Sequence, residues 1–463
     1  MKTAVITHFK GLKPRFSFAL LPLFTTFVCE HSDCASYHAA TRQYTDMTTT
    51  PLHALCFLAL IALTASCSSK ASTCTDDNTA DGEATDSIAT EQVEVVVGAA
   101  RTDQYVPLLT GKRIALMSNH TGMVGNRHTL DVMLEGSLNV TTIFSPEHGF
   151  RGDADAGEKV KSSVDEPTGI PIASLYDGSS PMPGKETMQQ FDVIVIDIQD
   201  VGTRFYTYYI TMLHLMDAAA IYGKEVVIFD RPNPNGMYVD GPILDMKYKS
   251  GVGRLPIPVV HGMTLGELAL MADGEGWLTG GKQLGDKLTV IPCQNYTHQT
   301  RYQLPIPPSP NLRSMTAIYL YPSLCYFEAT DVSIGRGTEK PFEIYGHPDL
   351  KDLGYDFSFT PQSVAGAKNP PQLGITCYGR DLSGLDHEAI IAAQINLEYI
   401  IDAYRNLGAD SKFFSSFFEK LIGNSQIRTM IADGMTADQI RASWSEDVEQ
   451  FIQQRRKYLI YNE

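Results

Sequence analysis

The sequence has no run of lysine and arginine of the kind that contacts nucleic-acid phosphates, and its formal net charge is −16 at pH 7. We therefore expect no nucleic-acid partner, because a basic face does not easily emerge from such a chain. The sequence also lacks a G-x-S-x-G elbow, a P-loop and an H-E-x-x-H motif. These absences disfavour α/β-hydrolases, P-loop nucleotide hydrolases and zinc peptidases.

Cysteine is scarce in the part of the chain that is expected to fold. Of the 8 cysteines, only Cys293, Cys325 and Cys377 lie beyond residue 74, and they have no metal-ligand spacing. A disulfide scaffold and a zinc site are therefore not expected, and we predict that these three thiols are buried as small apolar side chains. The sequence indicates no metal and no cofactor.

Two apolar stretches near the N-terminus are typical of export signals. The second stretch, at 55–63, follows Met47 and leads through small residues to Cys67, as in the cleavage box of a bacterial lipoprotein. It departs from that box in two ways: Leu63 is one place too far upstream, and no Lys or Arg follows Met47. We expect an export region at 1–67, with 1–46 as a gene-start artefact and Cys67 as the lipidated residue.

That export region predicts an exported protein, either periplasmic or lipid-anchored, which contacts the membrane only through the anchor. A transmembrane anchor is the alternative, but the apolar run is shorter than the roughly 20 residues that a spanning helix needs. Residues 68–92 are rich in Ser, Thr, Asp, Glu and Ala, which is the composition of a flexible acidic tether.

The rest of the chain alternates between apolar runs and helical patterns. Near-continuous apolar runs at 113–117, 139–144, 191–198 and 225–229 are typical of strands that are covered on both faces. Helices are predicted at 129–134 and at 208–222, the second ending at Gly223. This series predicts βαβ units and a parallel sheet, and hence an α/β fold.

The second half of the chain predicts a helix-rich region. Thr264 with Glu267 forms a capping box, and a proline-rich stretch at 305–310 marks a domain joint, giving domains at 93–304 and 305–463. Beyond the joint, strands and loops give way to helices. Two helices are each expected to keep one apolar face. The first carries Ile390, Ala393, Leu397, Ile400, Tyr404 and Leu407; the second begins at Thr436 with Gln439 and carries Trp444, Val448, Phe451 and Ile452.

Polar residues follow each predicted strand, and the carboxyl ends of parallel strands meet at one edge, where ligands bind in open α/β sheets. The candidates at this edge are Asn119, Glu147, Asp200, Arg204 and Asn233. Each of them alone is explained by a helix cap or a turn, most readily Asn119 and Asn233. Glu147 is the strongest candidate, because a carboxyl that is partly shielded from water has a raised pKa and can donate a proton. The alternative interpretation is that Glu147 lies in a plain surface turn.

His148, Arg204, Tyr206 and Arg336 are candidates for contacts with a ligand. His148 would orient Glu147 or contact the substrate. Arg204 offers a forked donor and Tyr206 a stacking face, a combination that suits a carboxylate-bearing sugar; the alternative is that these residues begin a helix core. Arg336 lies between two glycines at 335–338 and is placed to approach a ligand anion.

Several long motifs in fixed order resemble the exo-β-N-acetylmuramidase family of glycoside hydrolases. They are SNHTG at 118–122, SPEHG at 145–149, DIQDVGTRFYTY at 197–208, DRPNP at 230–234, PSPN at 308–311 and GRGT at 335–338. The resemblance extends from about residue 93 to the C-terminus. One departure is His120, where another polar residue, often Gln, is expected.

This resemblance implies a Rossmann-like domain followed by a smaller α+β C-terminal domain, with the active site in the cleft between them. It implies exo-acting release of non-reducing terminal N-acetylmuramic acid from peptidoglycan fragments, such as the disaccharide with N-acetylglucosamine, in cell-wall turnover. The family's proposed catalytic glutamate corresponds to Glu147. Because glycosidases need a second carboxylate or the substrate's own acetamido oxygen, we hypothesise that Asp200 or Asp230 places water or stabilises the oxocarbenium ion. Arg204 or Arg336 would then pair with the lactyl carboxylate.

Two other functions are compatible with the same fold. The first is a non-catalytic lipoprotein that binds muropeptides or sugars, since fold does not determine function. The second is a nucleotide-dependent enzyme, which the missing glycine fingerprint disfavours.

Overall fold

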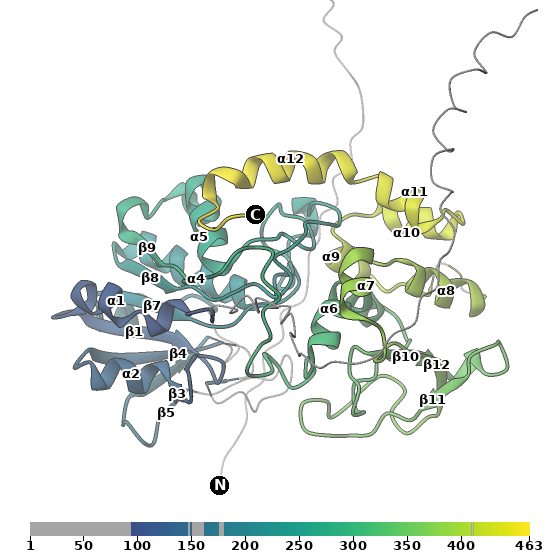
Figure 1. The fold of residues 1–463 in the computed structure, drawn as a ribbon, viewed down its shortest axis with the longest axis horizontal. Coiled ribbons are helices and arrows are strands. Elements are labelled where there is room, and N and C mark those ends of the chain that lie inside the picture. Colours follow the sequence, from purple (N-terminus) through teal and green to yellow (C-terminus); the bar gives the residue numbers. More distant parts are fainter. Residues whose placement is uncertain (1–93, 147–148, 151–161, 176–179, 409, 411) are drawn as a thin grey trace, which may run out of the picture. The chain divides into compact units, whose positions relative to one another are not determined.

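The computed structural model describes residues 94–463 except 147–148, 151–161, 176–179, 409 and 411 (Figure 1). These residues belong to one compact unit, Ile88–Glu463. Within the described ranges, no helix is long and apolar enough to cross a bilayer. The predicted export region and tether at 1–92, including Cys67, lie outside the described residues.

A seven-stranded sheet, in the order β5-β6-β4-β1-β7-β8-β9, organises the first part of this unit (Figure 1). Its strands pair in parallel except for β5, which is antiparallel to β6. The strands are β1 (Arg113–Ser118), β4 (Asn139–Ser145), β5 (Ser163–Val164), β6 (Pro171–Ser174), β7 (Val193–Asp197), β8 (Glu225–Phe229) and β9 (Leu288–Ile291). The four predicted strands are β1, β4, β7 and β8; the prediction missed the three shorter strands.

Helices cover both faces of this sheet. They are α1 (Thr102–Leu109), α2 (Thr129–Glu135), α3 (Lys185–Met188), α4 (Tyr208–Tyr222) and α5 (Leu265–Gly274). Side chains alternate along a strand, so that Leu116 and Val195 join the core beneath α1 and α2, while Met117 and Ile196 join the core beneath α4 and α5. Burial on both faces explains why these strands read as continuous apolar runs.

Local sequence signals place two of these helices as predicted. Helix α4 ends at Gly223, which takes the left-handed conformation with φ of 70°. Helix α5 begins with the predicted capping box. The Thr264 side chain accepts from the Glu267 backbone, and the Glu267 carboxylate accepts from the Thr264 backbone. A hairpin of β2 (Met123–Val124) and β3 (Arg127–His128) leads into α2.

The second part of the unit is smaller and contains helices and an antiparallel sheet in the order β10-β12-β11. Its elements are α6 (Met315–Leu324), η5 (Cys325–Ala329), β10 (Ile344–His347), β11 (Phe357–Phe359), β12 (Cys377–Asp381), α7 (His387–Ala393), α8 (Glu398–Asn406), α9 (Phe418–Ile422), α10 (Gln426–Ala432), α11 (Ala437–Ala442) and α12 (Ser445–Arg455). The predicted fold class, a parallel α/β sheet followed by a smaller α+β region, is confirmed. Cys293, Cys325 and Cys377 are free and buried, as predicted.

Two of the predicted C-terminal helices are each divided in the structure. The first is interrupted at Gln394, whose φ is +56°, so that α7 and α8 are separate. In the second, the capping box of Thr436 and Gln439 begins α11, and Ser443 and Trp444 separate α11 from α12. Apolar periodicity continues across both breaks because the separate helices pack on the same core.

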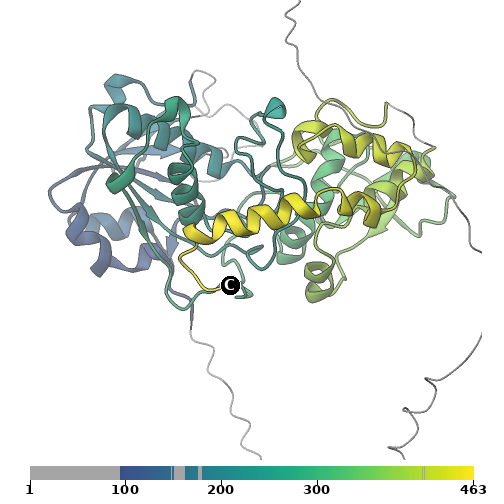
Figure 2. The same cartoon turned by 90° about the horizontal axis from the view of Figure 1, so that it is seen from above.

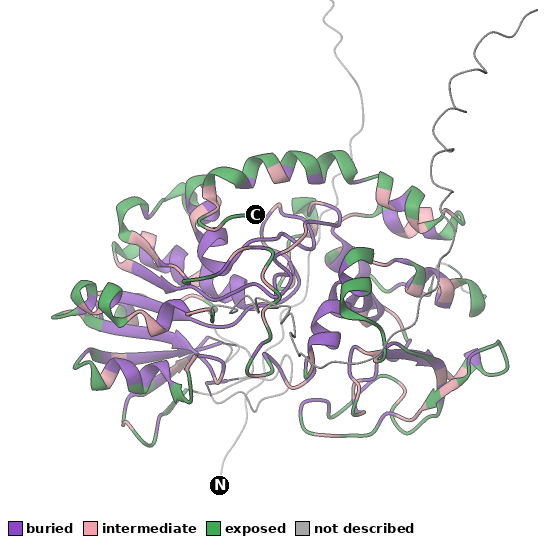
Figure 3. Ribbon diagram, viewed as in Figure 1, coloured by how far each residue is buried: buried purple, intermediate pink, exposed green. Residues whose placement is uncertain are grey.

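The two parts share one hydrophobic core, which includes residues from strand β1 to helix α12. Helix α12 runs from α11 back to α5 (Figure 2). It buries Val448, Phe451 and Arg455, while its opposite face is exposed (Figure 3). This one-sided burial matches its spacing of apolar residues.

Candidate active site

The loops that follow β1, β7 and β8 are joined by hydrogen bonds at the carboxyl edge of the sheet. The amide oxygen of Asn119 accepts from the Thr121 hydroxyl at 2.6 Å, and that hydroxyl oxygen accepts from the backbone of Gln199 at 3.0 Å. The side chain of Gln199 donates to the carbonyl oxygen of Pro232 at 2.7 Å. The structure therefore brings together three of the loops in which candidates were predicted.

Asn119 also connects this edge to the proline-rich segment. Its amide nitrogen donates to the Tyr208 hydroxyl at 2.9 Å, and the hydroxyls of Tyr206 and Tyr208 both donate to the carbonyl oxygen of Pro308, at 2.9 and 3.1 Å. Asn119 is fully buried. It therefore supports the tyrosines from behind, and its own amide is not exposed to a ligand.

Among the described residues of this edge, Asp200 carries a carboxylate oxygen with free acceptor capacity. Its Oδ1 accepts from the backbone of Gly202 at 2.8 Å, whereas Oδ2 has no hydrogen-bond partner among the described residues. The side chain is only 7% exposed, and burial raises the pKa of the Asp200 carboxyl to about 7, against the opposing effect of backbone N–H groups. Such a group titrates near neutral pH.

Asp230 is fully engaged inside the protein. Its Oδ1 accepts from the Gly266 backbone at 2.9 Å, and its Oδ2 accepts from the hydroxyls of Thr264 and Tyr461, each at 2.7 Å. Burial raises the pKa of this carboxyl to about 6. Because both oxygens bond groups at the start of α5 and near the C-terminus, this position suits a structural carboxylate.

Asn233 forms the turn after β8, which is the alternative to a ligand contact that its sequence position allowed. Its side-chain oxygen accepts from the backbone of Asn235 at 2.8 Å, and its amide donates to the carbonyl oxygen of Met263 at 2.8 Å. The residue is 3% exposed. Its side chain is thus used within the fold.

Arg204 lies in the interior, at 0% exposure. Its Nη1 donates to the carbonyl oxygens of Pro242 and Ile257, each at 2.7 Å, and its Nη2 donates to those of Leu421 and Ile422, each at 2.9 Å. The predicted substrate role does not fit this position, because the guanidinium fork is enclosed by backbone carbonyls. The motif at 197–208 contains the arginine, but it does not show whether the side chain points to a ligand or into the core.

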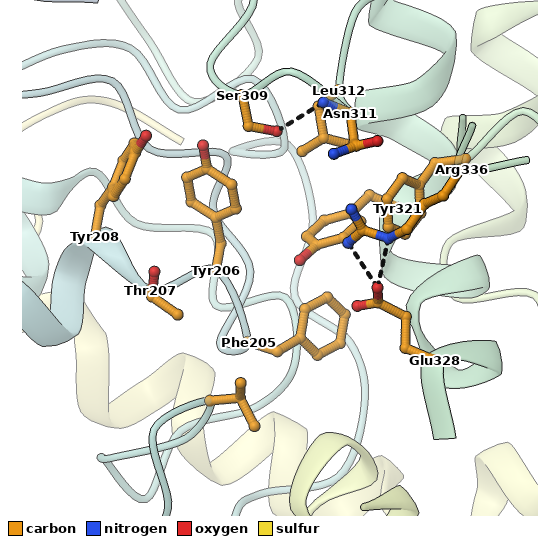
Figure 4. Close-up of a pocket in the computed structure, with 12 residues that line it drawn as sticks. Phe205, Tyr206, Thr207, Tyr208, Ser309, Asn311, Leu312, Tyr321, Glu328 and Arg336 are labelled. Carbon is orange, nitrogen blue, oxygen red and sulfur yellow. Dashed lines mark hydrogen bonds and ion pairs between the residues drawn. The ribbon is translucent and has the colours of Figure 1, made fainter. Parts of the chain in front are cut away.

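A pocket lies where the start of α4 meets the second part of the unit (Figure 4). Tyr206 and Tyr208 form one side, and Arg336 and Glu328 the other. The lining residues are Phe205, Tyr206, Thr207, Tyr208, Val252, Ser309, Asn311, Leu312, Tyr321, Glu328, Arg336 and Phe342. Within this lining, Glu328 and Arg336 are the only charged residues. Its aromatic walls and few polar groups are typical of small-ligand sites.

Arg336 lines this pocket on the side opposite the two tyrosines. It forms an ion pair with Glu328 at 2.6 Å, and the two side chains are 19% and 25% exposed. Its guanidinium carbon lies 4.9 Å from the centre of the Phe342 ring. The sequence did not indicate Glu328 and Tyr321 as pocket residues, because they follow no predicted strand of the large sheet. Asn311 belongs to the PSPN motif at 308–311 but was not among the predicted site residues.

Some predicted residues cannot be placed. Glu147 and His148 follow β4, which ends at Ser145, but they lie outside the described residues. Among the residues that the structure does describe, no group of three or more His, Cys, Asp or Glu side chains is arranged to hold a metal ion.

The fold defines a two-part α/β protein with a pocket at the junction of its parts. Residues 114–316 match the family description "Exo-beta-N-acetylmuramidase NamZ, N-terminal", and residues 319–461 match the corresponding C-terminal description. The peptidoglycan beta-N-acetylmuramidase NamZ of Bacillus subtilis (strain 168) is 37% identical over 374 residues, which cover 77% of this chain and 89% of that protein.

Two crystal structures of DUF1343 family proteins from Bacteroides fragilis NCTC 9343 are also similar. One is 57% identical with a TM-score of 0.75, and the other is 28% identical with a TM-score of 0.67. Each match covers 80% of this chain and 99% of the other. The chain belongs to the exo-β-N-acetylmuramidase family, as its motifs predicted.

Proposed function

We propose that this protein is an exo-acting glycoside hydrolase that releases non-reducing terminal N-acetylmuramic acid from peptidoglycan fragments during cell-wall turnover. The observation that carries the proposal is the pocket itself, in which an aromatic face and a guanidinium stand opposite each other. An aromatic face can stack on a sugar ring, and a guanidinium can pair with a carboxylate on that sugar. The membership of the chain in the exo-β-N-acetylmuramidase family supports the same substrate.

Arg336 is the residue that pairs with the lactyl carboxylate, because it lies in the pocket and Arg204 does not. Tyr206 offers the stacking face, held in place by its bond to Pro308. Asn119 and Asn233 act from behind, since both are buried and hydrogen-bonded within the fold. Changing Arg336 to Ala should remove most of the discrimination against N-acetylglucosamine.

For the chemistry, we assign Glu147 as the general acid, with His148 orienting it. Asp200 is the better second group, because its Oδ2 is unpartnered within the described structure while both oxygens of Asp230 are hydrogen-bonded. An ionised Asp200 would place water or stabilise an oxocarbenium ion.

The direct test uses a chromogenic β-N-acetylmuraminide beside the matching N-acetylglucosaminide. Release from the muraminide only, lost in Glu147→Gln, would support an exo-muramidase with Glu147 in the chemistry. Near-normal kcat/KM in Glu147→Gln would show that Glu147 is not the general acid. If the folded protein cleaves neither substrate but binds the disaccharide tightly, the non-catalytic binding protein becomes the better interpretation.

We also propose that the protein is exported and anchored through a lipid on Cys67, on the strength of the apolar stretch at 55–63 and the small residues that precede this cysteine. Metabolic labelling with a fatty-acid analogue should mark the wild type and not Cys67→Ala. Labelling that survives this substitution would exclude Cys67 as the modified residue.

A further inference from the structure

Glu328 bonds one edge of the Arg336 guanidinium. The Glu328 Oε1 accepts from Arg336 Nε at 2.8 Å and lies 2.6 Å from Nη2. Its Oε2 accepts from the thiol of Cys325 at 3.6 Å. A carboxylate that takes two donors from one side of a guanidinium fixes the plane of that group and the direction of its other side.

Other contacts fix the same guanidinium. The Phe342 ring supports its flat face at 4.9 Å. The flanking glycines have φ of +78° at Gly335 and +81° at Gly337, and a Cβ there would meet the carbonyl oxygens of Lys340 at 2.5 Å and Gln362 at 2.3 Å. The backbone on both sides of Arg336 is therefore held against neighbouring chain, and the side chain enters the pocket from a rigid base.

One edge of the guanidinium remains open. Nη1 lies on the side away from Glu328 (Figure 4) and makes no hydrogen bond within the described part of the chain. Arg336 is partly exposed and lines the pocket. The group therefore has one edge bonded to an internal anion and one edge available to an anion of the ligand.

We propose that Glu328 is a positioning and specificity residue: it directs the Nη1 edge of Arg336 at the carboxylate of the bound sugar, and its charge limits how tightly that carboxylate is held. This inference rests on the proposed function. The released sugar carries the same carboxylate as the substrate, so an uncompensated arginine would bind product as strongly as substrate. Uniform binding of that kind lowers KM without accelerating the reaction and slows product release.

The variant that separates charge from geometry is Glu328→Gln. Its amide oxygen can accept from Arg336 Nε as Glu328 does, but the opposing negative charge is gone. Binding of free N-acetylmuramic acid to the full chain, measured by calorimetry, should tighten about tenfold at low salt. Binding of N-acetylglucosamine should not change, and KM for the muraminide should fall together with kcat.

The double variant Glu328→Gln/Arg336→Gln is the matched control, since it replaces the whole ion pair with neutral amides. The gain in acid binding should disappear in it. The inference is overturned if Glu328→Gln leaves acid binding unchanged or weaker, if the gain persists without Arg336, or if kcat is lost while acid binding stays the same. The last result would place Glu328 in the chemistry.

If Glu328→Gln does not fold, Glu328→Asp provides the test, because it keeps the charge and withdraws the acceptor by one methylene. Selectivity for the acid over N-acetylglucosamine should then fall, and unchanged selectivity would overturn the inference. Measurements on the wild type distinguish failure of the proposed function from failure of this inference. A wild type that binds and cleaves no muramic acid derivative defeats the proposed function, whereas an active wild type with an unaffected Glu328→Gln defeats this inference alone.

Discussion

The guanidinium of Arg204 donates to the backbone carbonyl oxygen of Leu421 at 2.9 Å across 217 positions of sequence. Arg204 follows β7 at the carboxyl edge of the large sheet, and Leu421 lies in α9 of the second part. Because the same side chain also bonds the carbonyl oxygens of Pro242 and Ile257, it joins three separate segments in the interior. The two parts are thus connected by a buried cation as well as by apolar packing.

Replacing Arg204 by lysine should destabilise the protein strongly. A lysine has three N–H donors on one atom and cannot reproduce a planar fork that bonds four carbonyl oxygens. We expect a loss of about 3–5 kcal/mol, as for other broken buried charge networks, measured by urea unfolding. Arg301→Gln is the control, because Arg301 and its partner Glu388 are 39% and 63% exposed, and it should change the free energy of unfolding little. Normal stability with lost activity in Arg204→Lys would restore Arg204 as a substrate contact.

Replacing Tyr461 by phenylalanine tests the contact between the C-terminal segment and Asp230. The hydroxyl donates to the buried Asp230 carboxylate at 2.7 Å and accepts from the backbone of Cys293 at 2.8 Å. Removing it should cost about 1–3 kcal/mol, because a bond to a charged buried group is lost. Tyr458→Phe is the matched control, since its partner Glu275 is more exposed, and it should cost less. Equal effects of the two variants would contradict this account.

The fold was predictable from the sequence where one element carried its own signal. Helix α4 ends at a glycine and was predicted to the residue. Strand β7 is an apolar run that is buried on both faces, and it lies within the predicted run 191–198. The short strands β5, β6 and β9 were missed, because pairing with a longer neighbour defines them and their own patterns do not. The divisions at Gln394 and at Trp444 were missed because apolar spacing is the same whether one helix or two cover a core.

The candidate site was predictable only in part. The ends of β1, β7 and β8 predicted loops that do meet at one edge of the sheet, and the glycine-flanked cation Arg336 lines the pocket. The role of Arg204 did not follow, since its side chain is directed inward by carbonyls from residues 242 to 422. Glu328 was missed because no local sequence pattern marks it. It lies in η5, and its place in the pocket follows from its ion pair with Arg336.

Stability should depend on Asp200 in a pH-dependent way. Burial raises its pKa to about 7 in the folded protein, above the value of about 3.9 expected in the unfolded chain. Below about pH 4 both states are protonated and there is no penalty; as pH rises towards 7, the unfolded chain loses its proton first and folding becomes less favourable. Asp200→Asn should therefore gain stability over the wild type as pH rises, by at most roughly 4 kcal/mol. Denaturation at pH 4.5 and 7.5 measures this, and a gain that is equal at both values would contradict it.

Activity should rise as the Asp200 carboxyl ionises, whereas stability should fall. If the Asp200 carboxylate places water or stabilises positive charge, kcat/KM should rise with pH through about 7, where this carboxyl loses its proton. Asp200→Asn should lower kcat/KM at all pH values. A pH profile with no change in slope near 7, in a fully active wild type, would indicate that Asp200 serves the fold only.

Gly202→Ala should disturb the edge of the sheet from which the site is built. Gly202 has φ of +76°, a conformation that side chains disfavour, and a Cβ there would lie 2.1 Å from the side-chain oxygen of Asn233. The Asn233 amide cannot move freely, because it bonds Met263 and Asn235. We expect a loss of about 2–4 kcal/mol and a large fall in kcat/KM, because the Gly202 backbone also donates to Asp200. Gly384→Ala is the control, since a Cβ there meets nothing within 4 Å and should shift the free energy of unfolding by less than about 0.5 kcal/mol. If both glycine variants unfold at the same urea concentration as the wild type, the close contact between Gly202 and Asn233 does not constrain the loop after β7.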